Sequence, residues 1–299
     1  MIAGTWLWVV FTLLAAAGQT ARNAMQRELT ATLGTVGATH VRFLFGFPFA
    51  IVFLASVVVI GGYALPRPPL IFWPWVLWGA IAQVLATALM LAAMNDRSFV
   101  VTIAYIKTEA VQAAIFGLIF LGDRVTLPLM VAIVVATVGV VMMSLKAGGA
   151  APGGLKPTLL GLISGGMFAL SAIGYRGAIL SLDNPSFVLT ATFTLALGLV
   201  LQAALLTIYL AFRQPSVLEA IARAWRRSLF AGFMGASASE FWFLAFALTS
   251  VANVRTLALV EVLFAQAISF FVFKQATRQR EAFGMCLIVV GVALLIWAQ

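Results

Sequence analysis

The sequence predicts an all-α integral membrane protein with ten transmembrane helices, arranged as two inverted five-helix repeats. Composition, the spacing of apolar runs and a central break support this fold class. Of the 299 residues, 63% are hydrophobic and only 9% are charged, and the mean hydropathy is +1.10. Soluble domains are about half apolar and about a quarter charged. This composition therefore excludes a soluble fold.

Ten apolar runs, bounded by charged residues or by Pro and Gly clusters, follow one another along the chain. A helix needs about 20 apolar residues to cross a bilayer, and spans of this length must be helices because every backbone polar group has to be bonded internally. The predicted spans are 5–22, 38–62, 71–94, 98–121, 126–145, 158–180, 186–212, 229–249, 253–273 and 282–298.

A Gly/Pro-rich connection at 148–157 divides the spans five and five. We expect a first repeat at 1–147 and a second at 158–299. Aligning the halves places Glu109 on Glu261, and the chain has only six glutamates. Because five is odd, two tandem halves enter the membrane in opposite orientations, an arrangement typical of carriers with a midplane site between the halves.

Basic residues are distributed unevenly between the two sets of predicted loops. The loops after spans two and four carry only Arg67 and Arg124. The loops after the odd-numbered spans carry Arg22, Arg27, Arg97, Lys146, Lys156, Arg213, Arg223, Arg226, Arg227, Lys274, Arg278 and Arg280. Cytoplasmic loops are enriched in Lys and Arg, so this bias places both termini outside the cytoplasm.

Several charged residues fall inside predicted spans or near their ends. Glu109 and Glu261 lie deep within theirs, where a charge is costly unless it pairs or faces a water-filled cavity. Both are predicted to bind substrate or to couple transport to protons. Arg42, Arg176 and Arg255 lie nearer span ends, where structural ion pairs and snorkelling to the interface are equally good interpretations.

The spacing of Tyr105, Glu109, Gln112 and Phe116 places these residues on one face of the fourth span. A polar stripe inside a membrane is suited to a water-filled site, where a carboxylate meets an ammonium group or takes up a proton. Tyr105 and Gln112 are therefore predicted to line the substrate site.

Further residues complete the predicted site. His40, the only histidine, is a candidate proton relay because its charge changes near neutral pH; a histidine that is simply hydrogen-bonded is the alternative. The other predicted substrate-binding residues are Lys107, Gln83, Glu240 and Trp242.

Other functional classes lack their signatures. There is no catalytic constellation, nucleotide-binding motif or metal-ligand spacing, and Cys286 is the only cysteine. The sequence thus predicts no enzyme, no cofactor and no metal. Its expected partners are a small-molecule substrate and the lipid bilayer, with no nucleic acid and no required oligomer. We expect a multi-pass protein of the cell membrane, or of the inner membrane in a bacterium.

Short motifs resemble the EamA-like group of the drug/metabolite transporter superfamily. Thr108 to Ala114, followed by Phe120-Leu121-Gly122-Asp123, resembles that group's fourth span, which a Glu-Pro pair opens and a Phe-Leu-Gly-Glu turn closes. Arg42-Phe43-Leu44 is similar to its Arg-Phe-Leu in span two, and 288–291 to its glycine-containing last helix. The resemblance implies ten helices in two inverted repeats around a central cavity.

The chain departs from this family pattern at three points. Ala110 and Val262 replace the prolines that would follow the two glutamates, and Lys274-Gln275 replaces the acidic turn of the second half. Members of the family usually have both termini in the cytoplasm, whereas the charge bias here indicates the opposite. The orientation stays open.

The favoured function is a secondary active transporter that exports a small polar metabolite, such as an amino acid, by alternating access. Its drive would be proton antiport or a solute gradient. An importer or exchanger of a nutrient or sugar phosphate is the alternative within this class. A membrane-embedded lipid-modifying enzyme is the alternative from another class, and it would gather polar residues at one interface rather than at mid-depth.

Overall fold

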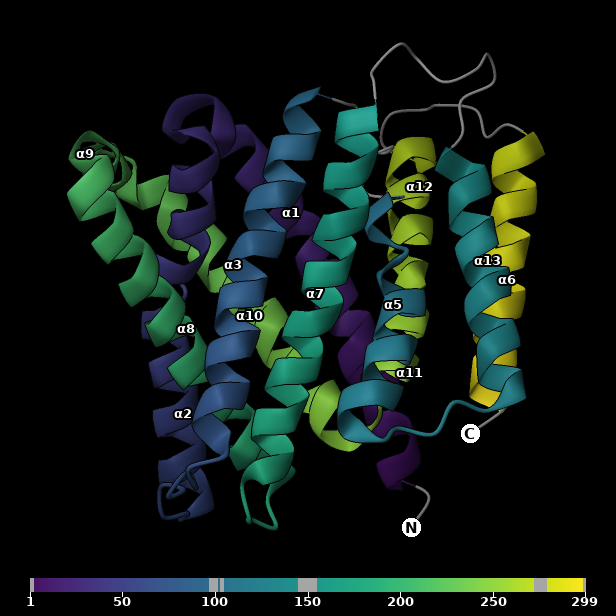
Figure 1. The fold of residues 1–299 in the computed structure, drawn as a ribbon, viewed down its shortest axis with the longest axis horizontal. Coiled ribbons are helices and arrows are strands. Elements are labelled where there is room, and N and C mark those ends of the chain that lie inside the picture. The colour runs from purple at the N-terminus through teal and green to yellow at the C-terminus, as the bar shows by residue number, and fades with distance from the viewer. Residues whose placement is uncertain (1–2, 97–101, 103–104, 145–154, 272–278, 298–299) are drawn as a thin grey trace.

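The computed structural model describes residues 3–96, 102, 105–144, 155–271 and 279–297, and these residues include no strand. Figure 1 shows the helices standing side by side. The helices are α1 (Ala3–Leu44), α2 (Phe47–Gly61), α3 (Phe72–Asp96), α5 (Glu109–Phe116), η1 (Gly117–Leu121), α6 (Leu127–Ser144), α7 (Leu155–Ser181), α8 (Phe187–Arg213), α9 (Pro215–Arg223), α10 (Trp225–Leu248), α11 (Val251–Leu257), η2 (Ala258–Val260), α12 (Glu261–Phe271) and α13 (Gln279–Trp297). The all-α prediction is confirmed for the described residues.

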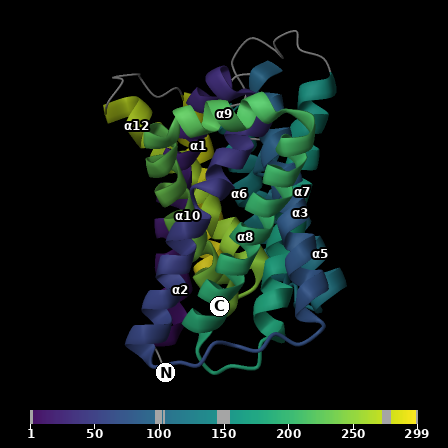
Figure 2. The same cartoon turned by 90° about the vertical axis from the view of Figure 1, so that its left-hand side faces the viewer.

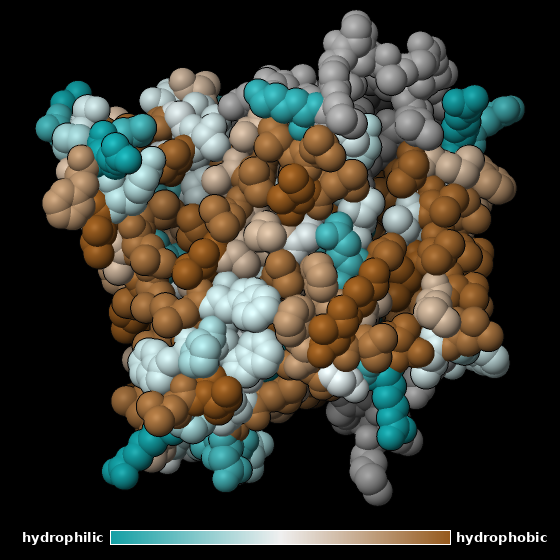
Figure 3. Space-filling model, viewed as in Figure 1, coloured by the Kyte–Doolittle hydropathy of each residue, from teal (hydrophilic) through white to brown (hydrophobic). Residues whose placement is uncertain are grey.

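Six helices of the described chain are long and apolar enough to cross a membrane. They are Glu28–Gly61, Phe72–Met94, Thr158–Ser181, Phe187–Arg213, Ser228–Leu248 and Gln279–Trp297, and Glu109–Leu121 and Leu127–Met143 are shorter apolar helices. Large apolar side chains such as Ile60 and Phe212 are exposed. Figure 3 shows a mostly hydrophobic surface at mid-height, with hydrophilic residues toward the upper and lower ends. A surface this apolar suits lipid, so the molecule is a multi-pass membrane protein.

The first helix is longer than predicted. The predicted loop between the spans 5–22 and 38–62, which contains Arg27, is wrong, because α1 continues through it. Arg and Glu are good helix formers, so they end the apolar run without ending the helix. The backbone leaves helical geometry at Gly34 instead, with φ 68° and ψ 175°. This conformation is open almost exclusively to glycine, and it separates two helical segments within α1.

Close helix pairs build the core. α1 packs along α10, α3 along α7, and α6 along α13. A Cβ atom added to Gly174 of α7 would lie 2.7 Å from the backbone nitrogen of Gly79 in α3. A Cβ atom added to Gly139 of α6 would lie 2.6 Å from the carbonyl oxygen of Gly284 in α13. Small residues that let backbones touch are typical of membrane helix interfaces.

A short helix, α9, occupies the connection at 213–227, where the sequence predicts only a loop. Pro215 opens it, in the first turn, where the missing N–H costs nothing. Its apolar side faces the bundle: Ile221 is buried, and Val217 lies against Gly37 of α1. Figure 2 shows α9 lying across the upper end of the upright helices.

Candidate functional site

Two interrupted helices carry the two glutamates that the sequence analysis singles out. Glu109 is the first residue of α5 and follows a turn at Lys107 and Thr108. Glu261 is the first residue of α12 and follows the 3₁₀ segment Ala258–Val260. The backbone stays hydrogen-bonded at both places: the Ala110 and Val111 N–H groups donate to Lys107 O and Thr108 O, and the Glu261 N–H donates to Ala258 O. Both glutamates therefore follow a tightened turn within an otherwise helical segment.

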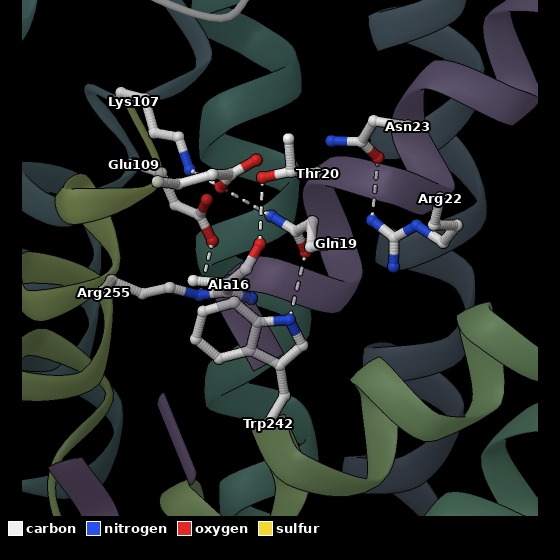
Figure 4. Close-up of polar contacts among 10 residues, drawn as sticks. Ala16, Gln19, Thr20, Arg22, Asn23, Lys107, Glu109, Trp242 and Arg255 are labelled. Atoms are coloured by element: carbon white, nitrogen blue, oxygen red, sulfur yellow. Dashed lines mark hydrogen bonds and ion pairs between the residues drawn. The ribbon is translucent and has the colours of Figure 1, made fainter. Parts of the chain in front are cut away.

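The two glutamates form ion pairs that cross between the interrupted helices. The Lys107 ammonium pairs with Glu261 Oε2. Arg255 Nε, from α11, lies 2.7 Å from Glu109 Oε1. All four side chains are at least nine-tenths buried, and Figure 4 shows Lys107, Glu109 and Arg255 converging on one region. Each carboxylate is thus neutralised by a cation from the other interrupted helix, and the pairs tie the two helices together.

Helices α1 and α10 close the other side of this cluster. Gln19 donates a hydrogen bond from Nε2 to Glu261 Oε2 at 3.3 Å, and its Oε1 accepts one from Trp242 Nε1 at 3.0 Å. The Arg255 guanidinium lies over the rings of Trp242, at 4.6 Å, and Phe246, at 5.3 Å. Such cation–π contacts stabilise a partly desolvated charge. The predicted site residue Trp242 therefore contacts the charged cluster.

One turn further along α1, Arg22 and Asn23 are also buried in the bundle. Arg22 Nη2 donates to Asn23 Oδ1 at 2.9 Å. The assignment of Arg22 to a loop is wrong, since it lies within α1 and is 1% exposed. Gln19, Arg22 and Asn23 were not predicted as site residues. The sequence could have indicated them, because Gln19, Arg22 and Asn23 recur with Gln26 at helical spacing and so form one polar face of α1.

A small cavity of about 20 Å³ lies at the cluster. It is lined by Gln19, Arg22, Asn23, Met90, Ile106, Lys107, Glu109, Phe168, Arg255 and Glu261. A second cavity, of about 10 Å³, includes Arg42, Gln83, Tyr175 and Ser239 in its lining. Gln19, Phe168 and Arg255 line both cavities and so separate them. A space of this size holds roughly one water molecule, so little free volume lies between the charged groups.

Other predicted site residues lie away from the first cavity. Gln83 accepts a hydrogen bond from Gln202 Nε2 at 2.7 Å and lines the second cavity. Glu240 accepts one from Thr192 Oγ1 at 2.5 Å and lines neither cavity. His40 is buried with its Nε2 3.1 Å from Thr207 Oγ1, and it also lines neither cavity.

Tyr105 and Gln112, which the sequence places on one face with Glu109 and Phe116, contact α7. Gln112 Nε2 donates to the carbonyl oxygen of Leu162 in α7 at 3.3 Å. A Cβ atom added to Gly161 of α7 would lie 2.7 Å from Tyr105 Cβ. Tyr105 and Gln112 line neither cavity. Their role in substrate binding stays a prediction.

Two further arginines have different environments. Arg176 donates to the carbonyl oxygens of Phe246 and Thr249, which satisfies the end of α10, and lies 3.8 Å from Asp123. For Arg176 the structural interpretation fits. Arg42 is buried and donates to Thr87 Oγ1 at 3.2 Å. Among the described residues no His, Cys, Asp or Glu cluster could hold a metal ion.

Comparisons with known proteins give information about the fold alone. Neither a family model nor a curated protein matches this sequence. Among solved structures, 29 chains match. One, a protein known from its crystal structure, matches with a TM-score of 0.70 and 17% sequence identity, over 98% of this chain and 95% of that chain. Another protein therefore has the same overall helical fold, and at this identity the likeness extends no further.

Proposed function

We propose that this chain is a secondary active transporter that moves a small polar metabolite, such as an amino acid, across the membrane by alternating access. In this proposal it exports its substrate, driven by a solute gradient or by protons bound at Glu109 or Glu261. It is a member of the EamA-like group of the drug/metabolite transporter superfamily. Its ten spans form two inverted five-helix repeats, at 1–147 and 158–299.

The helix packing supports the inverted repeat. If span one corresponds to span six, then the α1–α10 pair corresponds to the α7–α3 pair, and both are among the closest pairs in the bundle. The α6–α13 pair would join the two equivalent last spans. In Figure 1, α1 begins and α13 ends on the same lower side, as an even number of crossings requires.

The crossed ion pairs are the observation that carries the transport proposal. Four charged side chains are buried between interrupted helices of an apolar bundle. Such charges are costly in a membrane and usually mark a substrate or ion pathway. Because each pair joins α5 or its preceding turn to α11 or α12, substrate or proton binding to one carboxylate would release a cation and loosen the two halves.

The closed cavity supports alternating access. About 20 Å³ is far smaller than any metabolite, so a substrate binds only if helices separate. A carrier requires such an occluded state between its two open states. The structure fits that role, with open states formed when the halves move apart on one side or the other.

Replacing Glu109 with Gln tests the proposal. Glu109→Gln keeps the shape of the side chain but removes the charge that pairs with Arg255. We expect solute flux in proteoliposomes to be abolished while the protein still folds and inserts. Glu219→Gln is the matched control, because Glu219 is exposed and pairs only with Arg223 on α9. Normal flux in Glu109→Gln would remove this carboxylate from the mechanism.

A further inference from the structure

Two buried arginines beside the crossed pairs have no carboxylate partner. Arg22 is 1% exposed and Arg42 is 2% exposed. Among the described side chains, the ion pairs of the bundle do not include either of them. Within the described part of the chain, Arg22 donates to an amide oxygen and Arg42 to a hydroxyl, and neither has a carboxylate partner. A buried charge is expected to be paired, so these two guanidinium groups call for an explanation.

The cavity linings carry an excess of positive charge. Arg22, Arg42, Lys107 and Arg255 line the two cavities, whereas Glu109 and Glu261 are the only carboxylates that do so among the described residues. Both glutamates already pair with cations. The described linings therefore carry two more positive than negative charges.

Unused hydrogen-bond donors surround the same space. Arg22 Nε and Nη1, Arg42 Nε and the Ser239 hydroxyl are buried without a hydrogen-bond partner in the described chain. Arg22 lines the first cavity, and Arg42 and Ser239 line the second. Glu109 Oε1 also has no hydrogen-bond partner among the described residues, although it pairs with the Arg255 charge, so the unpartnered atoms here are mostly donors. A ligand rich in oxygen acceptors would satisfy these groups.

The two arginines converge on one point of α10. A Cβ atom added to Gly235 would lie 3.4 Å from Arg22 Cδ and 3.6 Å from Arg42 Cγ. The stems of the two side chains thus meet beside α10, and like charges that lie near each other repel unless an anion lies between or beside them. Guanidinium groups bind carboxylate and phosphate groups through paired hydrogen bonds.

We propose that the substrate bound here carries a carboxylate or phosphate group, and that Arg22 and Arg42 bind it. This inference rests on the proposed transport function and narrows its cargo to organic anions. Binding joins the two cavities by displacing Gln19, Phe168 or Arg255, which separate them. A cationic substrate is disfavoured by the excess positive charge.

Anion binding to the purified full-length protein tests this proposal without requiring transport. Inorganic phosphate and malonate serve as phosphate and carboxylate probes, with chloride at equal ionic strength and putrescine as the cationic comparison. We expect phosphate or malonate to raise the thermal unfolding temperature of the wild type in a saturable manner. Which probe binds more tightly distinguishes the two anion chemistries.

Variants connect the binding to the two arginines. Arg22→Gln and Arg42→Gln should each weaken the binding about tenfold or more, because each loses a hydrogen bond made by a charged group. Arg22→Lys keeps the charge and should retain part of the binding, which separates a ligand contact from a folding defect. Arg223→Gln, at an exposed position on α9, should bind as the wild type does.

Three outcomes would overturn the inference: equal anion binding in Arg22→Gln and Arg42→Gln, no saturable effect of either anion, or a preference for putrescine. Exchange of the bound anion across proteoliposomes tests transport separately. Arginine-dependent binding without exchange would contradict the transport function and leave the anion site standing. If the protein transports a neutral or cationic solute and this flux is unchanged in Arg22→Gln, the transport function would stand and the anion site would be contradicted.

Discussion

The buried ion pairs of the site should contribute more to the free energy of unfolding than ion pairs at the surface do. Removing one partner of a buried pair costs about 3–5 kcal/mol, because the other charge is left without compensation. Glu109 and Arg255 form such a pair at 2.7 Å. Exposed pairs contribute little, and the Glu219–Arg223 pair on α9 provides the comparison.

A double-mutant cycle should reveal this coupling. We expect Glu109→Gln and Arg255→Gln each to lower the free energy of unfolding, and the double variant to lose less than the sum by about 1–3 kcal/mol. Chemical unfolding in detergent measures all three. The same cycle on Glu219 and Arg223 should show a coupling within about 0.5 kcal/mol. Additive effects at Glu109 and Arg255 would mean that the two charges do not stabilise each other.

At the residue scale, the sequence indicates the carboxylates better than it indicates their surroundings. Glu109 and Glu261 are recognisable because a charge within an apolar run is conspicuous. Arg22 is not, because a charge near the end of an apolar run is the ordinary signal of a loop. Gln112 shows the opposite case, because helical spacing from Glu109 suggests a site residue, whereas its side chain donates to Leu162 O in α7 and lines neither cavity.

Among the elements, the division of α1 depends on the backbone of one glycine. Gly34 adopts φ 68° and ψ 175°, which other residues avoid at a cost of about 1–3 kcal/mol. Gly62 also has a positive φ, but its ψ of 26° is left-handed helical, and asparagine tolerates that conformation. Nothing lies within 4 Å of a Cβ atom at either position, so only the backbone distinguishes them.

We therefore expect Gly34→Asn to lower the free energy of unfolding by about 1–3 kcal/mol, and Gly62→Asn by less than about 1 kcal/mol. Chemical unfolding in detergent compares the two variants directly. Equal losses would show that the Gly34 conformation does not limit stability.

The α6–α13 pair depends on direct backbone contact. A Cβ atom at Gly139 would lie 2.6 Å from Gly284 O, and one at Gly284 would lie 2.7 Å from Gly139 O. Because a helix backbone cannot yield locally, Gly139→Ala should lower the free energy of unfolding by about 1–3 kcal/mol. Gly235→Ala, in α10, meets only side-chain carbons at 3.4 Å or more and should gain up to about 1 kcal/mol from helix propensity.

Thermal or chemical unfolding of the two alanine variants shows whether the free energy of unfolding falls in Gly139→Ala and rises in Gly235→Ala. A neutral Gly139→Ala would mean that α6 and α13 separate easily.

At this scale, apolar length predicts helices well, whereas interruptions leave weaker signals. Apolar runs show where α3, α8 and α13 form, because lipid-facing helices need uninterrupted hydrophobic length. The interruptions before Glu109 and Glu261 lack the prolines that would indicate them, since Ala110 and Val262 follow the glutamates.

For the whole molecule, the distribution of basic residues predicts orientation. Moving Arg22 and Arg27 from a loop into α1 removes two charges from the bias. Arg213, Arg223 and Arg226 lie at the α8–α10 connection, whereas Arg67 and Arg124 lie in the loops on the opposite side. Lys and Arg favour cytoplasmic loops, so the termini are predicted to lie outside the cytoplasm.

Reporter fusions after Gln299 measure this orientation. Alkaline phosphatase should be active there and a fluorescent protein dark, because phosphatase folds only outside the cytoplasm and ordinary fluorescent proteins only inside. A fluorescent, phosphatase-inactive C-terminus would contradict the charge bias. It would agree with the cytoplasmic termini that are usual in the EamA-like group. Fusions in the α8–α9 connection, on the opposite side, should give the reciprocal pattern.

The small volume of the central cavities also bears on how the membrane holds its gradients. Protons cross a membrane protein rapidly along chains of hydrogen-bonded water, and a space for about one molecule interrupts any such chain. The two cavities are separated by Gln19, Phe168 and Arg255, and the fixed positive charges there repel hydronium. For the proposed carrier, such small cavities would favour a low proton leak in the idle state and so help a cell to keep its membrane potential.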